Sequence, residues 1–164
     1  MLKGGYRLMK GFLEDCYKIE RLAGEIYQRL AIDKGYAPEV CSVFHKLSSD
    51  ERAHARDIDL LLQAPAQGLD AFARISGEVV DAAVQLAERM VDRLDRERLS
   101  EEAALRLAVE MEQQFVKVHV NNAMHFNNPR VAALFEELAR HDQAHLDTLR
   151  ECLKWWHAER KPRQ

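Results

Sequence analysis

A carboxylate followed three residues later by a histidine occurs twice in this chain of 164 residues. The first pair is Glu51 and His54, and the second is Asp142 and His145. Residues three apart on a helix lie one turn apart on the same face, so each pair can direct an oxygen and a nitrogen to one point. Carboxylate oxygens and imidazole nitrogens are common metal ligands. The two pairs therefore predict metal binding.

The two halves of the chain repeat each other around these pairs. At an offset of 91 residues the matches are Pro38/Pro129, Val40/Val131, Phe44/Phe135, Leu47/Leu138, Glu51/Asp142, Ala53/Ala144 and His54/His145. Helical periodicity alone would align some of the apolar residues, so the polar matches carry the argument. In the preceding segment, at an offset of 92, Glu20 aligns with Glu112. Tyr27 aligns with His119 at the same offset, so each half supplies one further carboxylate.

Together these positions supply four carboxylates and two imidazoles. The predicted metal ligands are Glu20, Glu51, His54, Glu112, Asp142 and His145. A four-helix bundle can hold such a set around two metal ions, with one Glu from each of two helices and an acid-x-x-His motif from each of the others. Four negative charges neutralise two divalent cations, whereas without metal they would be costly to bury. Oxygen-rich ligation with two imidazoles favours iron, with manganese as the alternative, over zinc.

Other residues of metal-binding type are less well placed. Glu110 competes with Glu112, but positions two apart are separated by about 200° around a helix, so only one can face the site. The stripe of apolar residues on that helix favours Glu112. We expect His45 and His141 at exposed positions. His119 and His125 are expected to face inward or to lie near a helix end, and for His119 a supporting contact or an additional ligand is the alternative to a structural role.

Most of the chain is predicted to be helical, because apolar residues recur at spacings of three and four and Gly and Pro occur at few points. The expected helices cover residues 7–33, 38–64, 79–95, 100–126 and 129–160, and no segment predicts a strand. Pro38 and Pro129 fall in first turns, where a missing N–H costs nothing. Ser100 is a candidate N-cap followed by two glutamates.

The connection between the two halves is long enough to cross over the bundle. We therefore predict one all-α domain over residues 1–164. It consists of a helical hairpin over 7–64, a crossover with an extra helix over 65–98, and a second hairpin over 99–160. Trp155 and Trp156 are expected to close the bundle or a subunit interface rather than to bind a cofactor.

Composition places the chain among ordinary globular proteins, with 47% hydrophobic and 31% charged residues. The net charge of −3 and the interspersed acidic and basic residues argue against a nucleic-acid partner. No apolar run reaches the roughly 20 residues of a membrane span, and no signal-peptide pattern appears near the start. Three widely spaced cysteines fit neither a disulfide framework nor a metal-binding Cys pair. We expect a cytoplasmic protein with no membrane partner.

At these residues the chain resembles the ferritin-like superfamily, and within it the rubrerythrin and erythrin branch. The resemblance is carried by Glu20-x-x-Ala23-x-x-x-Tyr27, then Phe44, Leu47, Glu51 and His54. It covers nearly the whole chain apart from the connection over 65–98. The resemblance implies a ferritin-like four-helix bundle with two iron ions that reacts with peroxide or oxygen. It also implies an electron donor protein and, in our expectation, a homodimer.

The resemblance also assigns roles to single residues. Tyr27 would lie near the metals as a catalytic residue that hydrogen-bonds to a carboxylate, and Glu20 would be a terminal ligand. The bridging carboxylates would be either Glu51 with Glu112 or Glu51 with Asp142, and the resemblance leaves both alternatives open.

Three positions depart from the family pattern. Asp142 stands where the family has Glu, and the lost methylene shortens its reach by about 1.5 Å. Phe115 takes the place of an extra Glu that rubrerythrins carry, and His119 replaces a tyrosine-like position. No closely spaced Cys pair provides a rubredoxin-like site. A ferroxidase or iron-handling protein is therefore an alternative to a peroxidase, and a metal-depleted interaction module is a third hypothesis.

Overall fold

The computed structural model describes residues 2–64, 71–72, 77–121, 125–126 and 128–160. Helices account for most of this described chain. They are α1 (Leu2–Ala31), α2 (Pro38–Gln63), α3 (Gly77–Arg96), α4 (Glu101–Val116), the π-helix η1 (Lys117–Asn121) and α5 (Pro129–Glu159). All five predicted helices are present. Four of them have ends within a few residues of the predicted ends, and the exception is the helix predicted over residues 100–126.

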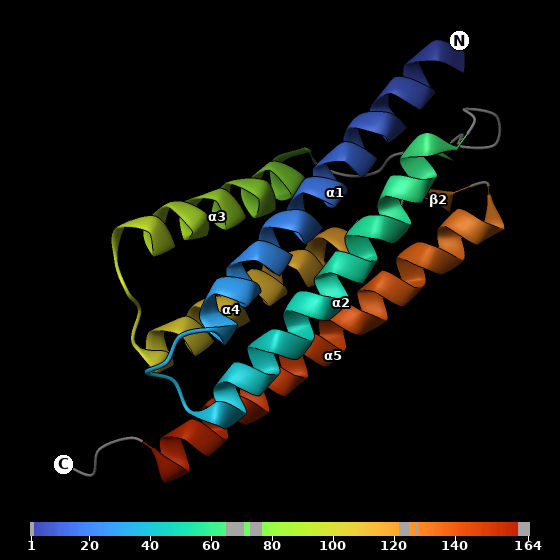
Figure 1. The fold of residues 1–164 in the computed structure, drawn as a ribbon. Helices are drawn as coiled ribbons and strands as arrows, with labels where there is room; N and C mark the ends of the chain where they lie inside the picture. The colour runs from blue at the N-terminus through green and yellow to red at the C-terminus, as the bar shows by residue number, and fades with distance from the viewer. Residues whose placement is uncertain (1, 65–70, 73–76, 122–124, 127, 161–164) are drawn as a thin grey trace.

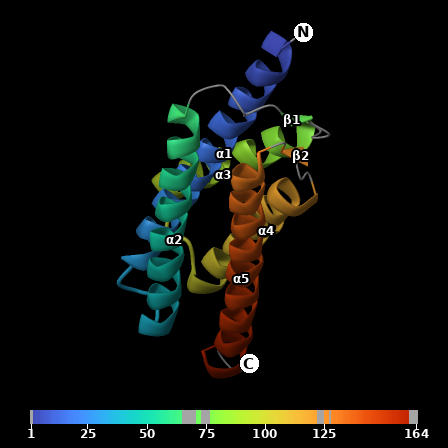
Figure 2. The ribbon, with the colours of Figure 1, turned by 90° about the vertical axis from the view of Figure 1, so that its right-hand side faces the viewer.

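Helices α1 and α2 form one hairpin, and α4 with α5 form the other (Figure 1). Helix α2 lies beside α5 in both views, so the two hairpins pack against each other (Figures 1 and 2). Helix α3 lies outside this four-helix arrangement and packs against α1 and α4. The arrangement is an all-α bundle with an extra helix in the crossover, as predicted from the sequence.

Two predictions about local structure are wrong. The helix expected over residues 100–126 is α-helical only to Val116, because the chain then changes to the π-helix η1. Beyond it, the two-residue strand β2 (His125–Phe126) pairs antiparallel with β1 (Ala71–Phe72). Strands this short carry no recognisable alternation of apolar and polar residues, so sequence periodicity could not reveal them.

Short polar contacts define where the later helices begin. The Ser100 hydroxyl accepts a hydrogen bond from the Ala103 N–H at 3.2 Å, which caps α4 as predicted. At the start of α5, Asn128 Oδ1 accepts from the Arg130 N–H at 2.9 Å, and Pro129 occupies the first turn. These contacts fix where both helices of the second hairpin begin.

One hydrophobic core runs through the bundle and includes residues from α1 to α5. At one end, Trp156 is 9% exposed and its Nε1–H donates to Glu101 Oε2 at 2.6 Å, which ties α5 to the start of α4. This contact closes the bundle, as expected for the tryptophan pair. Cys16 and Cys152 are buried and Cys41 is half-buried, and all three are free thiols. Within the described residues, no helix combines the length and apolar character needed to cross a lipid bilayer.

Candidate metal centre

The six residues predicted as metal ligands come together inside the bundle. They are Glu20 on α1, Glu51 and His54 on α2, Glu112 on α4, and Asp142 and His145 on α5. Each is at most 4% exposed, although four of them are carboxylates. Carboxylates and imidazoles are rarely buried this completely unless they are paired or bind a metal. Glu110, the rival candidate on α4, is exposed.

The six residues divide into two compact groups. In one group, ligand atoms of Glu20, Glu51, His54 and Asp142 all lie within 4.8 Å of one another. In the other, the same holds for Glu51, Glu112, Asp142 and His145. Two ligands on opposite sides of one ion, each at about 2.0–2.2 Å, lie about 4.4 Å apart, so each group is close to the size that one ion requires.

Glu51 and Asp142 belong to both groups, whereas the other four residues belong to one each. The sequence left two alternatives for the shared carboxylates, and the geometry favours Glu51 with Asp142. Glu51 comes from the first hairpin and Asp142 from the second. The two groups therefore share one carboxylate from each half of the repeat.

Several buried polar atoms of this centre have no hydrogen-bond partner within the described chain, and they indicate which atoms a metal ion could contact. Among the described residues, the buried side-chain atoms with no hydrogen-bond partner are Glu20 Oε1, Glu51 Oε1, Glu112 Oε2, His119 Nε2, Asp142 Oδ1 and His145 Nδ1. All belong to this cluster, and each such atom costs about 1–3 kcal/mol when left unpaired. His145 Nδ1 and Glu51 Oε1 face each other at 3.0 Å without forming a hydrogen bond. A cation between such atoms would satisfy them, so the residues present fit metal ions.

The electrostatics of these carboxylates agree with this interpretation. Burial, and next the negative charge of Glu51, raise the pKa of Glu20 and of Glu112 well above the ordinary value of 4.5. Burial also opposes ionisation of Glu51, but the proximity of the Glu20 carboxyl group and of the His145 and His54 imidazoles outweighs it and lowers the pKa of Glu51. Protons on Glu20 and Glu112 thus relieve the crowding of negative charge, and metal ions would displace these protons.

Tyr27 contacts the centre from α1. Its side chain is fully buried, and its hydroxyl donates a hydrogen bond to Glu112 Oε1 at 2.5 Å. Burial, reinforced by Glu112, raises the pKa of Tyr27 well above 10, so the phenol remains a donor at neutral pH. This is the contact with a carboxylate that the family resemblance implied.

His119 reaches the centre from the π-helix that follows α4. Its Nδ1 lies 2.5 Å from Asp142 Oδ2, and its Nε2 lies 3.6 Å from Glu20 Oε1. The expectation that His119 faces inward is confirmed. It lies outside both compact ligand groups, so its observed contact is a supporting one. Isolated π-helical turns inside α-helices are frequent at functional sites.

Sequence reasoning missed two residues that support the imidazoles from behind. His141 Nδ1 lies 2.9 Å from His54 Nε2, and Asp50 Oδ2 lies 3.2 Å from His145 Nε2. His141 is exposed as predicted, but it was not expected to touch the site. One signal was available, because residues 50 and 141 match at the offset of 91 and each precedes a shared carboxylate.

Comparison with known proteins bears on the identity of the chain. The family model described as Rubrerythrin matches residues 11–153, which span most of the bundle. The chain belongs to the rubrerythrin family. No curated protein and no solved structure was found to match it. Family membership and the buried cluster of carboxylates and imidazoles together fit a diiron protein.

For a rubrerythrin, this chain has an altered second hairpin. Asp142 occupies a shared position, where its reach is shorter than that of Glu. Phe115 is buried with 1% exposure on the inner side of α4. The inner face of α4 therefore presents one carboxylate, that of Glu112, to the centre, and the imidazole of His119 follows from η1.

Proposed function

We propose that this chain binds two iron ions in the centre and acts as an oxidoreductase that reduces peroxide or oxygen. The observation that carries the proposal is the convergence of unpartnered buried atoms on two groups that share Glu51 and Asp142. A metal-free bundle would have no reason to retain so many unsatisfied polar atoms at one point. Membership in the rubrerythrin family supports the same assignment.

The ligands divide between two metal positions. Glu20 and His54 complete one position, Glu112 and His145 complete the other, and the shared carboxylates join both. When bound, two irons supply the two electrons that cleavage of an O–O bond requires. Manganese fits the same donor set and is the alternative metal.

The surrounding residues orient the ligands and exclude water. Tyr27 holds Glu112 by its hydroxyl hydrogen bond, which leaves Glu112 Oε2 free toward the centre. Phe115 and other buried residues of the core keep the centre dry, which strengthens its electrostatic interactions. Reduction of peroxide to water consumes two protons as well as two electrons, and Glu20 and Glu112 do not supply these protons, because both carboxyl groups lose their own protons when they bind metal.

The electrons must come from a group outside these 164 residues. The 164 residues contain no closely spaced cysteine pair that could hold a rubredoxin-type iron. We therefore propose a separate electron donor protein, as the family resemblance implied.

Metal content and oxidation rate test this function. Protein loaded with Fe(II) without oxygen is analysed for iron, and its visible spectrum is followed as peroxide and then air are added. We expect about two irons per chain, an absorption increase typical of ferric diiron proteins, and faster oxidation by peroxide than by oxygen. Faster oxidation by oxygen would favour the ferroxidase instead. Protein that takes up no stoichiometric metal would contradict both and favour the interaction module.

A further inference from the structure

The two metal positions differ in the residue that contacts the imidazole ligand on the side away from the centre. Asp50 on α2 contacts His145 on α5, and His141 on α5 contacts His54 on α2. The contacts are reciprocal, because residues 50 and 141 are equivalent in the repeat and each supports the imidazole of the other hairpin. The equivalent residues are chemically different, since one is a carboxylate and the other an imidazole.

The charge around these two supports also differs. Asp50 is anchored by Lys46, whose Nζ lies 2.5 Å from Asp50 Oδ2. The position equivalent to Lys46 is Glu137, and its Oε1 lies 3.9 Å from His141 Nε2. Thus a carboxylate fixed by an ammonium group supports His145, whereas an exposed imidazole with one distant carboxylate supports His54.

A carboxylate behind a metal-binding imidazole fixes its tautomer and increases its basicity as a ligand. With Nε2–H donating to Asp50, the lone pair of His145 Nδ1 faces the centre, where that atom has no other partner. The carboxylate of Glu112 in the same position is held by Tyr27 at 2.5 Å. Both ligands that are unique to this position are therefore held from outside the cluster.

The other position is less constrained. Its unique carboxylate, Glu20, has no hydroxyl donor equivalent to Tyr27 among the described residues, and the imidazole nearest to its Oε1 outside the ligand set, that of His119, is 3.6 Å away. Its unique imidazole, His54, is supported by His141, whose side chain is 46% exposed. An exposed neutral support restrains a ligand less than a carboxylate that is itself anchored.

We propose that residues 50 and 141 make the two metal positions unequal, so that the position containing His145 binds its ion first and more tightly than the position containing His54. This inference rests on the proposed metal-binding function. Outer partners of metal ligands typically contribute about 10- to 100-fold in affinity, which is enough to separate two binding phases.

The test is a stepwise titration of metal-free protein with Co(II), followed by visible absorption and calorimetry. The wild type is expected to show two phases. His54→Ala should keep the tight phase and lose the weak one, whereas His145→Ala should lose the tight phase. Asp50→Asn should weaken the tight phase by about 10-fold or more. Asp57→Asn, at an exposed position on the same helix, is the matched control and should change neither phase.

An exchange variant provides a test that does not depend on removing a ligand. In Asp50→His/His141→Asp, the carboxylate lies behind His54, so His54→Ala in that background should now remove the tight phase. Two equal phases in the wild type, or an Asp50→Asn variant that binds like the control, would overturn this inference and leave the proposed function standing. A wild type that binds neither Co(II) nor Fe(II) would overturn the proposed function as well.

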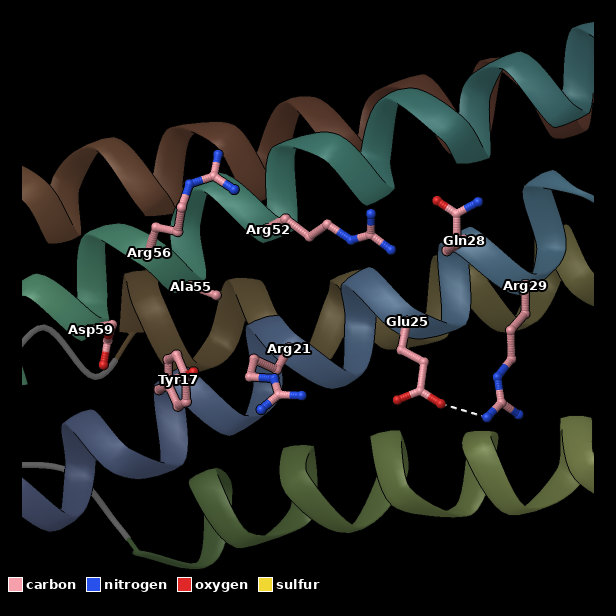
Figure 3. Close-up of a pocket in the computed structure, with 9 residues that line it drawn as sticks. All are labelled: Tyr17, Arg21, Glu25, Gln28, Arg29, Arg52, Ala55, Arg56 and Asp59. Atoms are coloured by element: carbon pink, nitrogen blue, oxygen red, sulfur yellow. Dashed lines mark hydrogen bonds and ion pairs between the residues drawn. The ribbon is translucent and has the colours of Figure 1, made fainter.

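A second observation concerns the outside of the bundle. A groove of about 460 Å³ lies against α1 and α2 and is lined by side chains of both helices (Figure 3). None of the six metal-ligand candidates lines it. Arg21 and Arg29 from α1 and Arg52 and Arg56 from α2 contribute four positive charges, against Glu25 and Asp59. This groove therefore carries a net charge of +2 on a chain whose net charge is −3.

Three of the four guanidinium groups lack a carboxylate partner among the described residues. Arg29 pairs with Glu25 at 2.5 Å (Figure 3). It also pairs with Asp95 at 2.5 Å. Arg52 and Arg56 have no such ion pair within the described chain, although they are like charges one helical turn apart, a spacing that is unfavourable. An anion in the groove would relieve that repulsion.

Two of these arginine side chains have contacts with α1 residues, although both are exposed. The guanidinium of Arg21 lies over the Tyr17 ring, 5.9 Å from its centroid. The stem of Arg52 lies over Gly24, where an added Cβ would be 3.3 Å from Arg52 Cγ. Figure 3 shows Arg52 extending along the space between α2 and α1.

We infer that this groove binds an anion with a phosphate group, because the planar fork of Arg matches phosphate oxygens and is available here from more than one side chain. The inference is independent of the metal centre. Binding of inorganic phosphate and of adenosine monophosphate is measured by calorimetry on the full chain. Tighter binding of the nucleotide would assign a larger phosphorylated ligand, and equal binding would assign free phosphate.

Variants decide whether the groove is the site. Arg21→Gln/Arg52→Gln is expected to weaken phosphate binding by about 10-fold or more, the effect of losing one charge-assisted hydrogen bond. Arg89→Gln, at an exposed position on α3 outside the groove, should bind like the wild type. No saturable binding by the wild type, or equal weakening in the Arg89 control, would overturn the inference.

Discussion

Nδ1 of His119 lies 2.5 Å from Oδ2 of Asp142, and this contact joins the two most unusual residues of the centre. Asp142 is one methylene shorter than the glutamate that the repeat places opposite it, Glu51. His119 holds one carboxylate oxygen, so the other, Oδ1, is left free toward the centre. The π-helix that carries His119 therefore positions a side chain whose own reach is short.

This relationship predicts coupled effects of mutating the two residues. His119→Ala should leave Asp142 unsupported and lower metal occupancy below that of the wild type. Asp142→Glu alone should also lower it, since an extra methylene beside His119 overpacks a closed site and costs about 1–3 kcal/mol. In His119→Ala/Asp142→Glu the longer side chain has room, so occupancy should recover. Elemental analysis of the three variants checks this, and purely additive losses would contradict it.

Glu51 belongs to both ligand groups, so its loss should act on both metal positions. The melting temperature of metal-free Glu51→Ala is the baseline of this experiment, because the substitution relieves the crowding of buried carboxylates but also removes the contacts of Glu51 with His54 and His145. The increase in melting temperature that added iron gives the wild type should disappear, since binding at 100 times the dissociation constant contributes about 2.7 kcal/mol.

Glu110→Ala provides the matched control for this experiment. Glu110 is exposed on α4, two residues before Glu112. Its variant should keep the full gain in melting temperature on adding iron. A Glu51→Ala protein that gains as much as this control would contradict the assignment of Glu51 as a shared ligand.

Stability of the metal-free protein should fall as pH rises. Because the pKa values of Glu20 and Glu112 are raised above 4.5, the folded state keeps protons that the unfolded chain releases. Their contribution is present below pH 4.5 and is lost as pH rises through the folded pKa. His119 acts in the same direction above pH 6.5, because Asp142 outweighs burial and raises its pKa. The lowered pKa of Glu51 acts only below pH 4.5.

The stabilisation that bound metal gives should have the opposite pH dependence. Ions must displace the protons that the empty centre holds, so the gain in melting temperature on adding metal should grow with pH. Thermal melts with and without Mn(II), between about pH 5 and about pH 8, measure both slopes. A metal-induced gain that is the same across this range would contradict the protonated state of Glu20 and Glu112.

Tyr27→Phe should destabilise the metal-free protein. The substitution keeps the ring but removes the hydroxyl donor to Glu112 Oε1, which leaves a second oxygen of that buried carboxyl unpaired. The expected loss is about 1–3 kcal/mol in the free energy of unfolding, measured by urea denaturation. Tyr17→Phe, on the same helix but outside the centre, is the control and should change stability little.

The sequence was sufficient for most of the helices and for the proximity of the six candidate ligands. Spacings of three and four residues, two Pro residues in first turns and the Ser100 cap are local signals, and local signals determine helices. The repeat related Glu51 to Asp142 and Glu20 to Glu112, and the structure places all four in two overlapping groups, each of which contains one of the two imidazoles. Their convergence was predictable because a bundle directs equivalent inner faces to one axis.

The tertiary structure determined how the candidate ligands divide between two groups and which other residues contact them. Whether Glu112 or Asp142 pairs with Glu51 depends on the axial offset between hairpins, which no spacing within one helix encodes. The contacts of Asp50 and His141 cross between α2 and α5, so they exist only once those helices pack together. The change from α4 to the π-helix likewise sets the direction of His119 over a single turn. Periodicity is a property of one helix, whereas these contacts belong to the packing of several.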